Sequence, residues 1–266
     1  MSELINIENQ NTYVNPMAKN ISGVMSSELE GLPFSFNKIK IPSGGGLSFE
    51  IPGENEDEPE IVKEFTGVIL YHHAIRTYYR DKYNGSFVPP NCSSGDGING
   101  TGIPGGSCKT CRYAQYGTAD NNGMACKIRR KIYILRQNEV LPVIYELPTS
   151  SLWSFSNYIS YMFKTGKPTK SIITKFSLKK AQNQNGLTFS QAVFSKMRDL
   201  TSEELTIIGE LAAQTEIFAK NYNNIIDDDE TGKATMNEHF KSMSYEEKPP
   251  TNGVMEEISL TDDLPF

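Results

Sequence analysis

Residues 65–80 read FTGVILYHHAIRTYYR, a run rich in β-branched and aromatic residues. This composition is typical of strands, and the run is longer than an ordinary strand. It also contains too few turn residues to be divided into a hairpin. We therefore predict one long or bent strand here.

Shorter runs with the alternation of a half-buried strand lie on both sides of this segment. We predict strands at 38–42, 47–52, 127–135, 140–147, 171–180 and 187–197. A Gly-rich turn at 43–46 separates the first two runs, and Asn185-Gly186 is a strong hairpin signal between the last two.

Two segments have the periodicity of helices. Apolar residues of the first recur at helical spacing: Leu152, Phe155, Ile159, Met162 and Phe163. We predict a packing helix over 150–166, ended by Gly166. Thr201 and Glu204 form a capping box, which predicts a second helix over 201–226.

The order of these elements matches the plan of an oligonucleotide-binding (OB) barrel, in which a helix lies between the third and fourth strands. The predicted fold is mainly β: an OB-like β-barrel with an inserted four-Cys zinc ribbon, a packing helix, a C-terminal helix and a disordered acidic tail. The predicted divisions are a flexible arm (1–33), a core (34–200) with the insert at about 89–127, a helix (201–226) and a tail (227–266).

The formal net charge of −6 is unevenly distributed along the chain. Residues 1–60 carry 3 Lys+Arg and 10 Asp+Glu, residues 61–200 carry 19 and 7, and residues 201–266 carry 4 and 15. A basic middle between acidic ends is typical of a polyphosphate-binding core with solvated tails. The alternative is a basic face that only keeps the protein soluble.

All four cysteines lie within 35 residues, at Cys92, Cys108, Cys111 and Cys126. Disulfides are disfavoured in a cytoplasmic chain, and a Cys-x-x-Cys knuckle with two further thiols supplies the ligands of a tetrahedral structural zinc site. We predict one such zinc per chain. Because four thiolates leave no open position for water, this metal would hold the loop and not catalyse. An iron–sulfur cluster, or a redox dithiol at Cys108 and Cys111, stays open.

Cations and aromatic residues alternate on the predicted strands, and single-strand binders use this combination to track phosphates and stack bases. The candidate nucleic-acid contacts are Arg76, Tyr78, Arg80, Arg129, Lys131, Tyr133 and Lys175. The cysteine insert repeats the mixture with Lys109, Arg112, Tyr113, Tyr116 and Lys127. For any single aromatic residue, however, core packing is the commoner role.

No arrangement of residues indicates catalysis. His72 and His73 are adjacent, so on a strand they point to opposite faces and cannot act as a pair. The sequence has no Walker loop, nucleophile elbow or deaminase motif, and its basic core has no carboxylate cluster for magnesium. We therefore predict a binding protein and no enzyme, although an enzyme with an unrecognised site stays open.

The sequence ends in Leu260-Thr261 followed by Asp262, Asp263, Leu264, Pro265 and Phe266. This segment closely resembles the acidic tip of bacterial single-stranded DNA-binding proteins. The resemblance implies that these five residues bind replication or repair proteins, which capture the last Phe and its carboxylate. Ordinary members of that family are shorter and have no zinc insert. A basic β-barrel with zinc and an acidic tail is more similar to the single-strand-binding proteins of T-even-type phages, which use a different ligand set.

Together these features predict a phage-type single-stranded DNA-binding protein that serves DNA replication, recombination or repair. No window approaches the ~18 apolar residues of a membrane span, and the first residues lack the regions of a signal peptide. We therefore expect no membrane partner and a cytoplasmic location, in the bacterial host if the protein is phage-encoded. A recombination mediator or annealing protein, and a zinc-ribbon adaptor that binds duplex or protein, stay open as alternatives.

Overall fold

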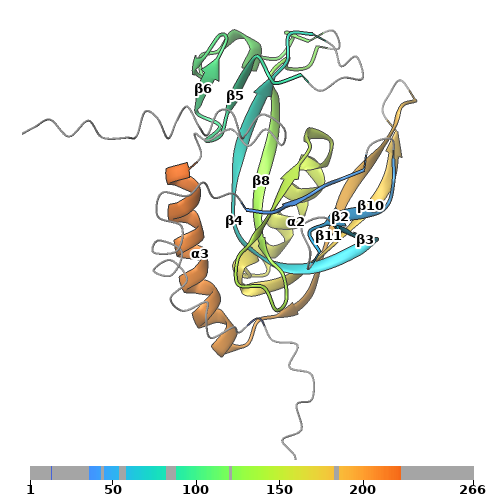
Figure 1. Ribbon diagram of the computed structural model, residues 1–266, viewed down its shortest axis with the longest axis vertical. Coiled ribbons are helices and arrows are strands. Elements are labelled where there is room, and N and C mark those ends of the chain that lie inside the picture. Colours follow the sequence, from blue (N-terminus) through green and yellow to red (C-terminus); the bar gives the residue numbers. More distant parts are fainter. Residues whose placement is uncertain are drawn as a thin grey trace, which may run out of the picture. The chain divides into compact units, whose positions relative to one another are not determined.

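The computed structural model describes residues 13, 36–42, 45–53, 58–81, 88–119, 122–182 and 186–222. Within these ranges the protein is mainly β, with one mixed sheet, a two-stranded sheet and two α-helices (Figure 1). The predicted mainly-β class is therefore confirmed. The predicted arm, apart from Tyr13, and the predicted acidic tail lie outside the described residues.

The long strand predicted at 65–80 is β4, Glu64–Tyr78. Its first residues pair antiparallel with β10 (Ile172–Gln182), and most of its length pairs antiparallel with β8 (Lys127–Leu135). The register with β8 shifts between Ile69 and Tyr71, and such an irregularity bends a strand. One bent strand therefore belongs to both halves of the sheet.

The strand order around β4 is β9-β8-β4-β10-β11, with every neighbouring pair antiparallel. In this order β9 is Val143–Leu147 and β11 is Thr188–Asp199. β1 (Lys38–Ile39) adds to β9 as a parallel strand, which makes the sheet mixed. Among the described residues no pairing joins β11 to β9 or β1, so the sheet is not closed and the predicted barrel is not confirmed.

A separate two-stranded sheet consists of β2 (Phe49–Ile51) and β3 (Glu60–Val62). A bridge between Lys40 and Glu50 attaches it to the segment that follows β1. Phe49 is fully buried and contacts the rings of Phe65 and Tyr145, so this small sheet contributes to the main core.

The main core lies on one face of the large sheet, where helix α2 (Leu152–Lys164) packs against it. Its aromatic members are Phe49, Phe65, Tyr145, Phe155, Tyr158, Phe176 and Phe194, and its aliphatic members include Ile132 and Leu147. Helix α2 ends as predicted, because Gly166 adopts φ +69° and the N–H of Lys167 donates to the carbonyl of Met162 at 3.0 Å. Short 3-10 turns at Thr149–Ser151 and Thr169–Ser171 flank this helix.

Helix α3 (Ser202–Tyr222) covers the other face of the sheet, beside β4 (Figure 1). Ile208 and Leu211 pack there against Val68 and Leu70. The predicted capping box is confirmed, because the N–H of residue 201 donates to Glu204 Oε2 at 2.9 Å and the N–H of residue 204 donates to Thr201 Oγ1 at 3.3 Å.

The carboxylate of Glu204 also holds residues from two other segments. Arg198 donates to its two oxygens at 2.7 and 2.8 Å, and the backbone N–H of Tyr13 donates to Oε1 at 3.1 Å. These hydrogen bonds, chiefly those from Arg198, outweigh the effect of burial and lower the pKa of Glu204 to about 2. Glu204 therefore links the start of α3, the end of β11 and Tyr13.

The cysteine insert continues the sheet beyond the end of β4. Its strands are β5 (Cys92–Ser94), β6 (Asn99–Gly102) and β7 (Gly106–Ser107), followed by a 3-10 turn, η2 (Arg112–Ala114). β5 pairs antiparallel with the last residues of β4, β6 with β5, and β7 with β6. The insert is therefore attached directly to the long strand, at the end away from β10.

Candidate functional site

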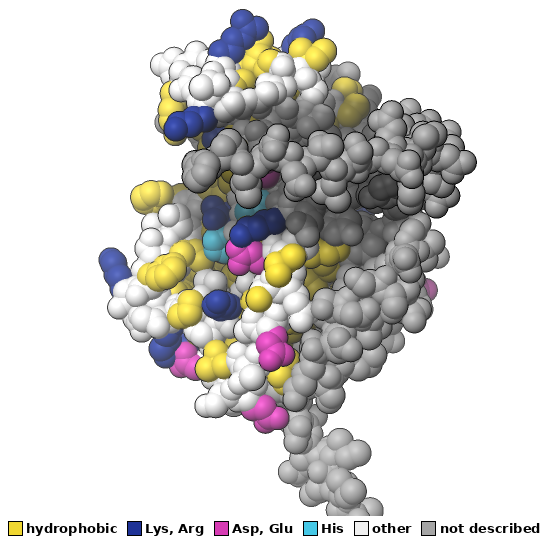
Figure 2. Space-filling view, turned by 90° about the vertical axis from the view of Figure 1, so that its left-hand side faces the viewer, with side chains coloured by type: hydrophobic (Ala, Val, Ile, Leu, Met, Phe, Trp, Pro, Cys, Tyr) yellow, Lys and Arg dark blue, Asp and Glu magenta, His cyan; other side chains and the backbone are white. Residues whose placement is uncertain are grey.

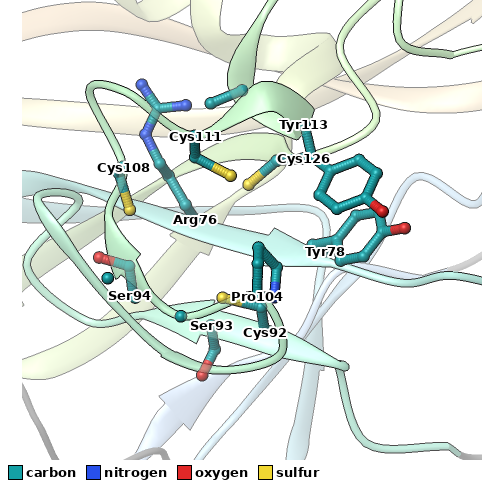
Figure 3. A pocket seen from close by; sticks show the side chains of 14 residues that line it. Arg76, Tyr78, Cys92, Ser93, Ser94, Pro104, Cys108, Cys111, Tyr113 and Cys126 are labelled. Atoms are coloured by element: carbon teal, nitrogen blue, oxygen red, sulfur yellow. The ribbon is translucent and has the colours of Figure 1, made fainter.

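The four cysteines come together at one small cavity in the insert (Figure 3). Cys92 begins β5, Cys108 follows β7, Cys111 precedes η2, and Cys126 precedes β8. All four are free thiols, and together they line a space of about 10 Å³, roughly what one water-sized sphere needs. Residues up to 34 positions apart in sequence thus form one sulfur-lined site.

Main-chain hydrogen bonds hold two of these cysteines in place. The N–H of Cys108 donates to the carbonyl of Ile98 at 2.7 Å, and the N–H of Cys126 donates to the carbonyl of Tyr113 at 2.8 Å. Burial raises the pKa of the Cys126 thiol, the charge of Arg76 opposes this, and the other three cysteines raise the pKa further. The other three cysteines therefore lie close enough to disfavour ionisation of Cys126.

No group of three or more His, Cys, Asp or Glu side chains in the described ranges has the arrangement of a metal site. The predicted zinc ribbon is accordingly not confirmed. The donor set nevertheless fits a thiophilic metal, because four thiols from separate segments face one cavity of suitable size.

Asp96 organises the turn between β5 and β6. Its carboxylate accepts hydrogen bonds from Ser94 Oγ, from the N–H groups of Ile98 and Asn99, and from Asn99 Nδ2, at 2.7–2.9 Å. Burial opposes ionisation, but these bonds outweigh it and lower the pKa of Asp96 to about 2. Gly97 follows with φ +72°, and a Cβ there would lie 2.8 Å from the carbonyl oxygen of Ala74. The turn therefore requires this Asp-Gly pair.

Two tyrosines stack at the edge of the cysteine cavity. The rings of Tyr78 and Tyr113 are 4.2 Å apart and nearly parallel, and both residues line the cavity. The guanidinium of Arg112 lies 4.6 Å from the centre of the Tyr113 ring and donates to its hydroxyl at 2.5 Å. Tyr78 is 7% exposed, so it packs the insert against β4.

The outer surface of the insert mixes exposed apolar and basic side chains. Its exposed apolar residues include Ile98, Ile103 and Tyr116, of which Tyr116 is 80% exposed. Its exposed cations are Lys109, Arg112 and Lys127, and Arg80 is exposed just after β4. Figure 2 shows basic and hydrophobic side chains side by side at the upper end of the molecule, where Figure 1 draws β5 and β6.

The predicted nucleic-acid contacts lie on different faces of the sheet. Arg76 and Tyr78 point toward the cysteine cavity, and Arg80 is exposed just after β4 ends. Lys131 and Tyr133 lie on the opposite face, as their pairing with His73 and Tyr71 on β4 requires. The structure therefore does not bring the predicted residues together as one surface.

The remaining predicted contacts are engaged with acidic side chains. Arg129 pairs with Glu146 at 3.1 Å, and Lys175 pairs with Glu64 at 2.6 Å. Exposed or half-exposed pairs of this kind are weak, so both cations can still exchange their partner for a phosphate.

The face that carries Lys131 and Tyr133 has a group of aromatic rings. Tyr71, His73 and Tyr133 lie with ring centres 5.6–6.1 Å apart, and Tyr133, only 3% exposed, also contacts Phe36. Burial, followed by the charge of Lys131, lowers the pKa of His73 to about 4. Tyr133 and His73 are therefore buried packing residues of this face.

His72 points to the other face, as predicted for adjacent residues of a strand. Its Nδ1 accepts a hydrogen bond from Arg130 Nε at 2.9 Å, and its ring contacts Phe155 edge-on. Burial, then the charge of Arg130, lowers the pKa of His72 to about 4. The two histidines therefore do not form a shared site.

Sequence reasoning missed the local roles of Asp96 and Arg130 and the inward direction of Arg76. The Asp96-Gly97 dipeptide is a turn signal that could have indicated the first of these. The partner-binding residues predicted at 262–266 lie outside the described residues.

Comparison with known proteins gives no match: no family model, curated protein or solved structure matches this chain. Among the described helices, none combines the length and the apolar character that crossing a membrane requires.

Proposed function

We propose that this protein binds single-stranded DNA through an OB-like core and its cysteine insert and serves DNA replication, recombination or repair. The supporting observation is the strand order β9-β8-β4-β10-β11 with α2 between β9 and β10. An OB barrel has the same order of its five strands and a helix in the same place. β4 corresponds to the first strand of that plan, β8 and β9 to the second and third, and β10 and β11 to the last two.

The position of the insert supports the same proposal. In OB folds nucleic acid lies against the second and third strands, between the connection of strands one and two and that of strands four and five. Here the cysteine insert is the first of these connections, because it joins β4 to β8. We infer that its exposed cations and its exposed Tyr116 contact phosphates and bases, a role that their exposure allows.

Zinc is the second part of the proposal. One zinc ion bound by Cys92, Cys108, Cys111 and Cys126 would supply a closed, structural centre. The insert is rich in glycine and its outer strands bury little apolar surface, so cross-linking four segments would hold its basic surface in shape. The purified protein should then contain one zinc per chain by elemental analysis, and iron with sulfide would contradict this assignment.

The third part of the proposal is a partner-binding role for the acidic tip at 262–266. Asp262, Asp263, Leu264, Pro265 and Phe266 would recruit replication or repair proteins, as their resemblance to the tip of bacterial single-strand-binding proteins implies.

The insert surface is tested by charge reversal with a matched control. Lys109→Glu/Arg112→Glu should weaken binding to single-stranded DNA and reduce the slope of log K against log salt by about 0.7 for each lost phosphate contact. Lys164→Glu/Lys170→Glu makes the same charge change at exposed positions in α2 and η4 (Thr169–Ser171) and should retain most of the slope. Equal effects of the two double variants would refute a DNA contact by the insert.

Base stacking needs a variant of its own. Tyr116→Ala should cost about 1–3 kcal/mol of binding free energy if a base stacks on this ring. Tyr116 is a better test than Tyr78 or Tyr133, because truncating those buried rings would also disturb the fold.

A further inference from the structure

Arg76 enters the cysteine cavity from β4 and has hydrogen-bond donors without acceptors. Its side chain lines the cavity and runs past Cys108 and Cys111, with the guanidinium at the edge of the cysteine group (Figure 3). Its Nε and Nη1 atoms are buried, and neither has a hydrogen-bond partner within the described part of the chain. A buried donor left unpaired costs about 1–3 kcal/mol, and more when it is charged. The location of Arg76 therefore requires an acceptor.

The neighbouring side-chain oxygens do not accept a hydrogen bond from Arg76 Nε or Nη1 in the described part of the chain. Ser94 opposes Arg76 in the β4–β5 pairing, but its hydroxyl donates to Asp96. The carboxylate of Asp96 accepts hydrogen bonds from Ser94, Ile98 and Asn99, three of them on Oδ1 and one on Oδ2. The other side-chain acceptors that line the cavity with Arg76 are the four cysteine sulfurs and the hydroxyls of Ser93, Tyr78 and Tyr113, and of these only the sulfurs gain a full negative charge when a metal binds.

The charge of a metal-loaded site makes these sulfurs suitable acceptors. Four thiolates and one Zn²⁺ carry a net charge of −2, and burying such a unit without compensation is expensive. A guanidinium cannot itself bind the metal, because it stays protonated and has no acceptor atom. It can donate N–H groups to thiolates and halve the net charge of the centre.

We infer that Arg76 is the charge-compensating residue of the four-thiolate centre and donates its Nε–H and Nη1–H groups to the cysteine sulfurs. This inference rests on the proposed zinc site. In this role Arg76 positions and stabilises the thiolates and is not a metal ligand. Because Arg76 belongs to β4, it also couples metal binding in the insert to the long central strand.

Zinc affinity measured by chelator competition on the full chain tests this role. Arg76→Met keeps much of the volume of the side chain but removes the charge and the donors, and should weaken zinc binding by about 10- to 100-fold. Arg76→Lys keeps the charge and should recover part of this loss. Arg80→Met is the matched control, because Arg80 is an exposed arginine four residues further along the chain that does not line the cavity, and its variant should bind zinc like the wild type.

The absorption spectrum of the cobalt-substituted protein distinguishes hydrogen bonding to the thiolates from a purely structural role of Arg76, because a structural role would leave the spectrum unchanged. Hydrogen bonds to a thiolate stabilise its lone pairs, so Arg76→Met should shift the sulfur-to-cobalt charge-transfer absorption to longer wavelength. Its thiolates should also react faster with an alkylating reagent. If Arg76→Met does not fold, zinc release is measured on Arg76→Lys instead. The inference then requires that this variant release zinc faster than the wild type, and an equal rate refutes it.

The two levels of the proposal fail in different ways. A wild-type chain that binds neither zinc nor cobalt refutes the metal centre, and the role of Arg76 with it. A wild type that binds zinc, with an Arg76→Met variant of unchanged affinity and spectrum, refutes only the role of Arg76.

Discussion

Replacing Glu204 by Gln tests how the fold is held together at the start of α3. The carboxylate accepts hydrogen bonds from Arg198, Thr201 and Tyr13, and its side chain is only 3% exposed. Its pKa falls from an ordinary value of 4.5 to about 2, a difference of about 2.5 units or about 3 kcal/mol. Since Arg198 is 40% exposed and therefore partly screened, we expect the variant to lose about 2 kcal/mol of unfolding free energy.

The pH dependence of this loss follows from the sign of the shift. A carboxyl group whose pKa is lower in the folded state stabilises the fold above its unfolded pKa, and that contribution disappears as the pH falls through the folded pKa. The advantage of the wild type over Glu204→Gln should therefore be constant above about pH 5 and decrease between about pH 4.5 and pH 2.

Urea unfolding followed by circular dichroism measures this difference, with Glu203→Gln as the control. Glu203 lies in the same first turn of α3 but is exposed, so its variant should lose less than about 1 kcal/mol. Equal losses for the two variants, or a loss at Glu204 that does not change with pH, would refute the reasoning.

Four further predictions concern the cysteine site, the two histidines and the acidic segment 227–266. Cys108→Ser should lower the melting temperature and increase protease cleavage within the insert, whereas the same melting temperature with and without chelator in the wild type would contradict a structural zinc. By NMR, His72 and His73 should titrate near pH 4, because burial and then their basic neighbours disfavour protonation; a midpoint near pH 6.5 would show that they are solvated. Deletion of 227–266, which carry 11 Asp+Glu and 3 Lys, should tighten single-strand binding at low salt. Deletion of Phe266 alone should leave this affinity unchanged but prevent capture of replication proteins, and retention of the same partners in a pull-down would refute the tip assignment.

The sequence predicted the elements whose signals are local. The β-branched run at 65–80, the capping box of Thr201 and Glu204, and the stop at Gly166 each correspond to the structure within a few residues. Such signals depend on backbone and side-chain chemistry within one turn or one strand, so they can be recognised without knowledge of the tertiary fold.

Features that depend on distant partners were not predictable in the same way. The parallel pairing of Lys38 and Ile39 with β9, and the three short strands of the insert, have no periodic signal of their own. The register shift after Ile69 cannot be read from residue types either.

In the candidate site, too, the sequence predicted what depends on residues close together in the chain and did not predict what depends on tertiary contacts. Clustering of the cysteines in sequence predicted that they would share a site, and they do line one cavity. The direction of Arg76 into that cavity, and the burial of Tyr133 beneath Phe36, depend on which elements cover each face of the sheet. Alternation along a strand therefore separated the two faces but did not indicate which was accessible.

The central claim, that this chain is a single-strand binder, is tested most directly by one titration series. Fluorescent single-stranded DNA, the duplex of the same sequence and the corresponding single-stranded RNA are titrated with the full chain at several salt concentrations. We predict that single-stranded DNA binds more tightly than the duplex, with an affinity that falls steeply with salt and shows little base preference. Equal affinity for the duplex, or no salt-dependent binding to any of the three, would contradict the account.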